Sequence, residues 1–97
     1  MRLIDLNPGF ISAGPSPEQR DGIGIIFDCP CGCDVLCAVY FRNPVDGGGP
    51  YPSERGPLWC RTGDTFEALT LTPSIHRSGP GGCGWHGWIK DGEVLTA

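Results

Sequence analysis

The chain has 97 residues, enough for one small domain, and its 16 glycines and 10 prolines disfavour long helices. Its net charge of −4, with seven Lys and Arg and no basic run, argues against a nucleic-acid-binding surface. No segment approaches the ~20 apolar residues of a membrane span, and the first residues do not resemble a secretory signal, so we expect a reducing, cytoplasmic location and no membrane partner.

Short β-rich runs separated by Gly and Pro turns dominate the N-terminal half. Met1–Asn7 is predicted as a first strand, and Phe10–Gly22 as a loop with a helical turn over Pro17–Arg20. Two stronger strands follow at Ile23–Phe27 and Val35–Phe41. The cysteine-rich segment between these two strands is therefore predicted to form the turn of a hairpin.

The middle of the chain begins with the Gly- and Pro-rich segment Asn43–Pro57, which we expect to be a flexible insertion. Trp59–Arg61 and Phe66–Leu71 are predicted as strands on either side of a turn at Thr62–Asp64. The second of these strands is expected to end within Thr72–Ile75.

The C-terminal part is predicted to contain one more hairpin. His76–Gly82 has the composition of a loop and precedes a strand at Trp85–Lys90. Asp91-Gly92 is typical of a tight β-turn and leads into Glu93–Thr96. The predicted fold class is mostly β: a small antiparallel sheet and hairpin assembly over residues 1–97, stapled by a cysteine-rich zinc site.

The cysteines suggest that zinc site. Three of the six alternate in Cys29-Pro30-Cys31-Gly32-Cys33, and Cys83 stands three residues before His86. Alternating cysteines on a tight turn pair poorly with one another, because a disulfide needs Cα atoms roughly 4.4–6.8 Å apart and facing Cβ atoms. Converging thiolates suit a soft metal ion, with zinc as the default. We predict a closed four-thiolate site made of Cys29, Cys31, Cys33 and Cys83.

Two alternatives to this ligand set remain open. His86 would replace one of the cysteines in a three-Cys, one-His site, or the thiols would simply be buried and free of metal. Cys37, on a predicted strand, and Cys60, beside Trp59, are expected to be ordinary buried residues.

Ser74 and His86 are the candidates for chemistry near the metal. Ser74 follows a proline at a strand end, and a neutral imidazole is the usual base for a serine nucleophile. Glu67 or Asp64 would orient the ring, and backbone N–H groups of Gly79–Gly84 would form an oxyanion hole. The simpler interpretation is that Ser74 caps a turn and that His86 is a metal ligand or a hydrogen-bonded, partly buried ring.

The remaining aromatic residues have simpler expected roles. His76 is predicted as an exposed loop histidine. Trp59, Trp85 and Trp88 are expected to pack in the core or at its rim, and Trp85 is also a candidate for lining a substrate groove beside His86.

Three motifs together resemble a known family: Cys29-x-Cys31-Gly32-Cys33, Pro73-Ser74-Ile75 and Cys83-x-x-His86-x-Trp88. Their order is similar to that of the BubE-like family, small bacterial and phage proteins associated with ubiquitin-like conjugation operons. The resemblance implies a deubiquitinase-like peptidase that processes or removes a ubiquitin-like protein. By position, it implies Ser74 as nucleophile, His86 as general base and the four cysteines as the metal site.

The chain departs from the family pattern at three places. Trp85 precedes His86 where family members usually carry a serine, and Asp34 follows Cys33 in place of the usual glycine. The segment 43–57 resembles an insertion of this member.

Three functions compete at this stage. The first is a zinc-stapled serine peptidase acting on the C-terminus of a ubiquitin-like protein. The second is a non-catalytic zinc module that binds a protein partner through Trp85 and Trp88. The third is a thiol enzyme using Cys31 or Cys83, which requires a metal-free cysteine with a lowered pKa.

Overall fold

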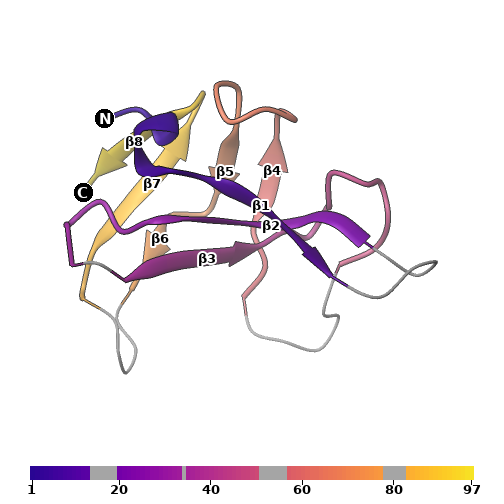
Figure 1. Ribbon diagram of the computed structural model, residues 1–97, viewed down its shortest axis with the longest axis horizontal. Coiled ribbons are helices and arrows are strands. Elements are labelled where there is room, and N and C mark those ends of the chain that lie inside the picture. Colours follow the sequence, from indigo (N-terminus) through magenta and orange to yellow (C-terminus); the bar gives the residue numbers. More distant parts are fainter. Residues whose placement is uncertain (14–19, 34, 51–56, 78–82) are drawn as a thin grey trace.

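The computed structural model describes residues 1–13, 20–33, 35–50, 57–77 and 83–97, and these residues build three small antiparallel sheets (Figure 1). The first sheet has the order β1 (Gly9–Ala13), β2 (Arg20–Asp28) and β3 (Leu36–Tyr40). The second pairs β4 (Cys60–Thr62) with β5 (Thr70–Thr72). The third has the order β6 (Ile75–His76), β7 (His86–Lys90) and β8 (Glu93–Thr96). The predicted mostly β fold class is confirmed.

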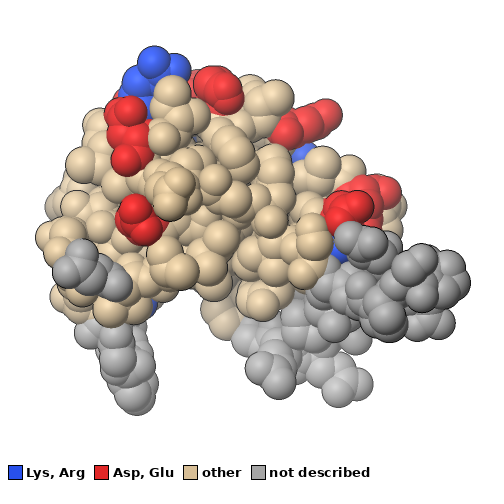
Figure 2. Space-filling view, in the orientation of Figure 1, with Lys and Arg blue, Asp and Glu red and all other residues tan. Residues whose placement is uncertain are grey.

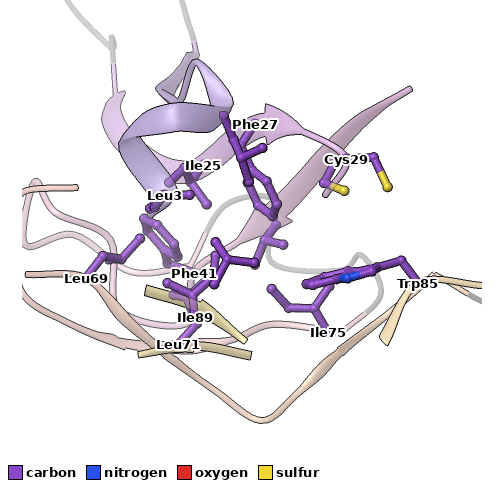
Figure 3. Packing of buried hydrophobic residues seen from close by; sticks show 14 residues of the cluster. Leu3, Ile25, Phe27, Cys29, Phe41, Leu69, Leu71, Ile75, Trp85 and Ile89 are labelled. Carbon is purple, nitrogen blue, oxygen red and sulfur yellow. The ribbon is translucent and has the colours of Figure 1, made fainter. Parts of the chain in front are cut away.

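The core lies between the first sheet and the other two. Figure 3 shows Ile25 and Phe27 of β2 on one side and Leu71, Ile75 and Ile89 on the other. All five side chains are buried. Side chains alternate between the two faces of a strand. Since Ile75 of β6 and Ile89 of β7 face the core, the residues next to them in sequence lie on the outer face of the third sheet. That outer face carries the candidate site.

The predicted first strand, Met1–Asn7, is wrong. Leu3–Leu6 forms the 3-10 turn η1, and Leu3 and Leu6 are both buried at its i and i+3 positions. Only the first residues behave like a strand: the N–H of Val94 donates to Met1 O, and the N–H of Leu3 to Gly92 O. Both leucines reach the core on a tight turn, whereas positions three apart on a strand face opposite sides.

The loop predicted at Phe10–Gly22 is also wrong where the structure describes it. Gly9–Ala13 forms β1, and Arg20 already belongs to β2. Phe10 lies opposite Ile25, and its ring stacks on Phe66 at a centroid distance of 4.6 Å. This long-range packing is invisible to local sequence patterns. The predicted helical turn lies outside the described residues except for Arg20.

The two strongest strand predictions are confirmed. Ile23–Phe27 lies within β2, which is longer at both ends, and Val35–Phe41 contains β3. The two strands pair antiparallel, from Gly24 opposite Tyr40 to Asp28 opposite Leu36. The cysteine-rich segment therefore forms the turn of a hairpin, as predicted.

The later hairpins are present with shifted boundaries. β4 and β5 are joined by a longer turn than expected, because residues 66–69 are not strand. His76 belongs to β6 and not to a loop, because it pairs with His86. The Asp91-Gly92 turn is confirmed: its φ angles of 49° and 75° are those of a type I′ turn, and Lys90 faces Glu93.

Residues 43–50 of the Gly- and Pro-rich segment are described in the structure and contact β2 and β4. Arg20 donates to the Asp46 carboxylate at 2.6 and 3.1 Å, and this guanidinium lowers the pKa of Asp46 to about 2. The Asn43 amide exchanges two hydrogen bonds of 2.9 Å with the backbone of Arg61. Residues 51–56 of the predicted insertion lie outside the described residues.

The distribution of charged side chains on the surface agrees with the net charge of −4. Figure 2 shows Asp and Glu scattered over the visible face, with little Lys or Arg among the described residues there. In the described part of the chain, no helix has the length and apolar character needed to cross a bilayer.

Replacing Gly92 by Ala tests the β7–β8 turn. The new Cβ would lie 2.5 Å from the Glu67 carbonyl oxygen, and φ is +75°, so we expect a loss of about 1–3 kcal/mol in the free energy of unfolding. Gly49→Ala is the matched control, because no atom of the described residues lies within 4 Å of the position that its Cβ would occupy and its φ is not positive. Denaturant titration measures both, and equal effects would contradict the turn geometry.

Candidate active site and metal centre

Four cysteine thiols from two hairpins converge on one point. Cys29, Cys31 and Cys33 lie on the β2–β3 turn, and Cys83 lies just before β7. The turn is held by hydrogen bonds from the N–H of Cys29 to Val35 O and from the N–H of Gly32 to Cys29 O, at 3.1 and 3.0 Å. Gly32 has a φ of +82°, a conformation that favours glycine. All four Sγ atoms lie within 4.8 Å of one another.

The donor set fits a tetrahedral soft metal ion. The Sγ atoms of Cys29, Cys31 and Cys83 are each 3.3 Å apart. Zn–S bonds of about 2.3 Å in a tetrahedron place the sulfurs about 3.8 Å apart, so a small outward shift would accommodate the ion. The described residues that gather here are four cysteines, and His86 is not among them. The geometry therefore favours the four-cysteine set over the alternative that includes His86.

The thiols differ in their readiness to ionise. Burial opposes ionisation of Cys29, but the N–H of Cys31 and the thiols of Cys31 and Cys83 together lower its pKa to about 6. Hydrogen bonding to Cys29 and Cys83 raises the pKa of Cys31 to about 12. A cation bound here would displace the remaining protons, since metal ligands bind as thiolates.

Arg77 adds a positive charge beside the cluster. Its Nη1 lies 4.0 Å from Cys33 Sγ, and its pKa is raised, first by hydrogen bonding to Cys29. Its backbone accepts a hydrogen bond from Gly84 N–H and donates one to Trp85 O, at 2.7 and 2.8 Å. Arg77 directly follows β6, and Cys83 lies just before β7. The guanidinium of Arg77 thus offsets negative charge on the thiolates.

The other two cysteines lie outside the cluster. Cys37 is buried as predicted, and burial raises its pKa to about 12. The prediction that Cys60 is buried is wrong: it is exposed on β4. Cys60 faces Thr72 on the outer side of the β4–β5 ribbon, while Arg61 and Leu71 take the inner side.

Ser74 and His86 meet on the outer face of the third sheet. His86 Nε2 lies 3.0 Å from Ser74 Oγ. With its proton on Nδ1, the ring accepts the hydroxyl hydrogen at Nε2, the arrangement that activates a serine. His86 opens β7 and Ser74 directly precedes β6, so the pair is a diagonal contact across two neighbouring strands.

Two aromatic rings hold the imidazole of His86. His76, opposite it on β6, lies at a centroid distance of 4.8 Å, and Trp88, two residues along β7, at 5.5 Å. Both neighbours are exposed on the same outer face. His76 was expected only as an exposed loop residue; its position two residues after Ser74 was the signal that it shares a strand face with the serine.

The carbonyl of Ser74 is tied to the first sheet. Trp59 Nε1–H donates to Ser74 O at 3.2 Å. The backbone of Trp59 is itself paired with the end of β3, donating to Tyr40 O at 2.9 Å and accepting from Arg42 N–H at 2.8 Å. Trp59 therefore fixes where Ser74 lies relative to the rest of the molecule.

Neither proposed carboxylate lies at His86. Asp64 is 82% exposed and pairs with Arg61 at 3.6 Å. The backbone of Glu67 lies against Gly92, beyond the end of β7 opposite to His86. Four strand steps of about 3.3 Å separate those two ends of β7. The described residues thus present a Ser–His pair whose imidazole is flanked by rings and not by either of these acids.

The predicted oxyanion loop is described only in part. The N–H of Gly84 already donates to Arg77 O, so it is not available as an oxyanion donor. Gly79, Gly81 and Gly82 lie outside the described residues.

Trp85 does not line the outer face as proposed. It is 6% exposed, faces the core near Cys29 and Ile75, and donates from Nε1 to Thr96 Oγ1 at 3.1 Å (Figure 3). Trp88 takes the outer position. Position 85, where members of the resembled family usually carry a serine, therefore faces away from the His86 ring, whereas Ser74 faces that ring.

A family model described as "Bacterial ubiquitination-like system serine protease (BubE)" matches residues 9–97. The match spans the eight strands of the described residues and contains the four clustered cysteines, Ser74 and His86. No curated protein and no solved structure matches the chain significantly.

Metal content tests the cysteine cluster. We expect one metal ion per purified chain, measured by elemental analysis, and a drop below about 0.1 ion per chain in Cys83→Ser, because three thiolates leave the tetrahedron open. Cys60→Ser is the matched control and should retain the ion, since Cys60 lies outside the cluster. A full complement of metal in Cys83→Ser would contradict this ligand set.

Proposed function

The chain belongs to the BubE family, the serine proteases of bacterial ubiquitination-like systems, and from this premise we propose that Ser74 and His86 are its catalytic pair. The proposed reaction is peptide or isopeptide cleavage at the C-terminus of a ubiquitin-like protein, as in a deubiquitinase. The observation that carries the proposal is the 3.0 Å hydrogen bond between Ser74 Oγ and His86 Nε2.

The proposed reaction has two acyl-transfer steps. Ser74 Oγ attacks the scissile carbonyl carbon while His86 Nε2 takes the hydroxyl proton. The tetrahedral intermediate collapses, the C–N bond breaks, and His86 gives that proton to the leaving amine. Water then attacks the acyl-enzyme ester while His86 takes one of its protons, and His86 returns that proton to Ser74 as the ester C–O bond breaks. The product leaves as a carboxylic acid, which loses its proton to solvent.

We assign the role of orienting the His86 imidazole to its two ring neighbours, His76 and Trp88. A carboxylate usually holds the imidazole of a serine hydrolase, and here the two candidate acids lie elsewhere. Ring contacts on both neighbours limit rotation of the His86 side chain and keep Nε2 directed at Ser74. This arrangement supports a catalytic dyad with aromatic positioning residues.

Zinc is the proposed ion of the cysteine cluster, held by Cys29, Cys31, Cys33 and Cys83. Four thiolates leave no open position for water or substrate, so a zinc ion here supplies a structural cross-link and no direct chemistry. The proposed setting is the reducing cytoplasm, where clustered cysteines bind metal in preference to forming disulfides. The proposed partner is a ubiquitin-like protein.

Two other functions are weaker. A thiol enzyme using Cys31 or Cys83 is disfavoured because both thiols belong to the cluster and the pKa of Cys31 is raised. A non-catalytic zinc module has one supporting observation, the exposure of Trp88 at 39% and Leu95 at 45% on one face. The module predicts no reactive serine, so the following experiment separates it from the peptidase.

A fluorophosphonate probe tests the nucleophile. The serine oxygen displaces fluoride from phosphorus, and we expect one adduct per metal-loaded chain, located on Ser74 by peptide mass spectrometry. Ser74→Ala should abolish the adduct, and His86→Gln should slow its formation at least 100-fold by removing the base. Cys60→Ala should label like the wild type. A metal-loaded wild-type chain without an adduct would refute the dyad and favour the binding module.

Variants of His76 test aromatic positioning. His76→Ala should slow fluorophosphonate labelling about three- to tenfold, because an aromatic pair contributes on the order of 0.5–1.5 kcal/mol. His76→Phe should label within about twofold of wild type, because the ring contact remains. Thermal unfolding of both variants serves as the control for folding. Equal loss in the Phe and Ala variants would show that the ring nitrogens of His76 matter, and not the ring contact.

A further inference from the structure

A groove of about 420 Å³ lies on the outer face between β5 and β7. Leu71 and Ile89 lie beneath it, with side chains that belong to the core. Its rims include Thr72 on β5, Trp88 on β7 and Leu95 on β8. The catalytic pair does not line this groove, so it is a separate feature of the same face.

The groove exists because β5 and β7 run side by side without pairing. β5 pairs with β4, and β7 pairs with β6 and β8. Near the dyad, the gap is closed by β6, which follows β5 and pairs with β7 through Ile75 and Gly87. At the far end, the turn after β7 contacts β5 and the residue before it: Gly92 N–H donates to Leu69 O at 2.9 Å, and Asp91 N–H donates to Thr70 Oγ1 at 2.8 Å. The groove is therefore built into the strand pairing and does not depend on a loop.

The groove begins beside the catalytic pair. Thr72 stands two residues before Ser74, and Trp88 two residues after His86, whose ring it contacts at 5.5 Å. Along β7, the two residues from His86 to Trp88 span about 6.6 Å, which is also the length of two residues of an extended peptide. A substrate with its scissile carbonyl at Ser74 would therefore carry a side chain over the groove one or two residues away.

The chemistry of the lining selects an apolar side chain. The accessible hydrocarbon of the groove comes from the exposed Trp88 and Leu95, which face each other across β7 and β8. No Asp or Glu is among the described lining residues, and Lys90 is the one charged group among them. A polar substrate side chain lying between Trp88 and Leu95 would lose hydration without gaining a hydrogen-bond partner from either of them, since neither the indole face nor the Leu side chain accepts a hydrogen bond.

We infer that this groove is the specificity pocket of the peptidase, and that it binds one apolar side chain on the acyl side of the bond cleaved. The inference rests on the proposed function. An enzyme that removes one modifier from several attachment points meets a different leaving amine each time, whereas the acyl side is common to all its substrates. Recognition is therefore expected on the acyl side, within the last two residues before the scissile bond.

Peptidyl-coumarin substrates test the inference, because they contain only acyl-side residues. With metal-loaded wild-type protein, the two residues before the coumarin amide are varied among Leu, Phe, Ser, Asp and Lys. We expect kcat/KM to favour Leu or Phe over Ser and Asp at one of the two positions by about 10- to 100-fold. No preference at either position would overturn the inference.

A charge placed on the rim should change that preference. Leu95→Glu should lower kcat/KM for the Leu peptide at least tenfold and raise it for the Lys peptide, because a carboxylate then faces the incoming side chain. Leu36→Glu is the matched control: Leu36 is an exposed strand leucine, at 53% against 45% for Leu95, and lies outside the groove, so its variant should keep the wild-type preference. Equal effects of the two variants would assign the change to surface charge and refute the pocket.

The two possible failures are distinguishable. If wild-type protein forms the fluorophosphonate adduct on Ser74 but shows no acyl-side preference, the pocket is refuted and the proposed function stands. If no adduct forms, the proposed function fails, and the pocket fails with it.

Discussion

The meeting of four cysteine thiols from two hairpins is the contact on which the site depends. The β2–β3 turn belongs to one layer of the fold, and Cys83 belongs to the β6–β7 pair in the opposite layer. Since β6 has only two residues, its pairing with β7 is short, and His76 and His86 form its last pair before the chain leaves toward the cluster. A bound ion would fix the same strand pair that positions the imidazole.

A second constraint is that the two faces of the third sheet have different roles. Ile75, Gly87, Ile89 and Val94 face the core, and their neighbours face outward. The inner face stabilises the sheet by burying hydrocarbon, which leaves the outer face free to carry Ser74, His76, His86 and Trp88. The Cβ of any residue at Gly87 would collide with the Leu95 carbonyl and the Trp85 ring. Glycine at position 87 is therefore required for β7 to lie this close to β8 and to the Trp85 ring.

Local patterns succeeded where neighbouring residues decide the structure. The hairpin around the alternating cysteines and the Asp91-Gly92 turn were predictable, because their strands are adjacent in sequence and their turn residues have strong backbone preferences. Local patterns failed at residues 1–13, where η1 and β1 form against β8 and β2. They also placed Cys60 inside and His76 in a loop, because the inward face of a short strand is set by its partner and not by its own composition.

The sequence by itself determined which chemical groups are present and which lie close by spacing: three thiols on one turn, a serine after a proline, and a histidine three residues after a fourth cysteine. The tertiary structure alone decided that residues 54 positions apart share one thiol cluster, that Ser74 reaches His86, and that rings flank that imidazole where an acid was expected. It also decided that a groove opens next to the pair. The physical reason is that these features arise from strand pairing and core packing between distant segments, whose register no local pattern specifies.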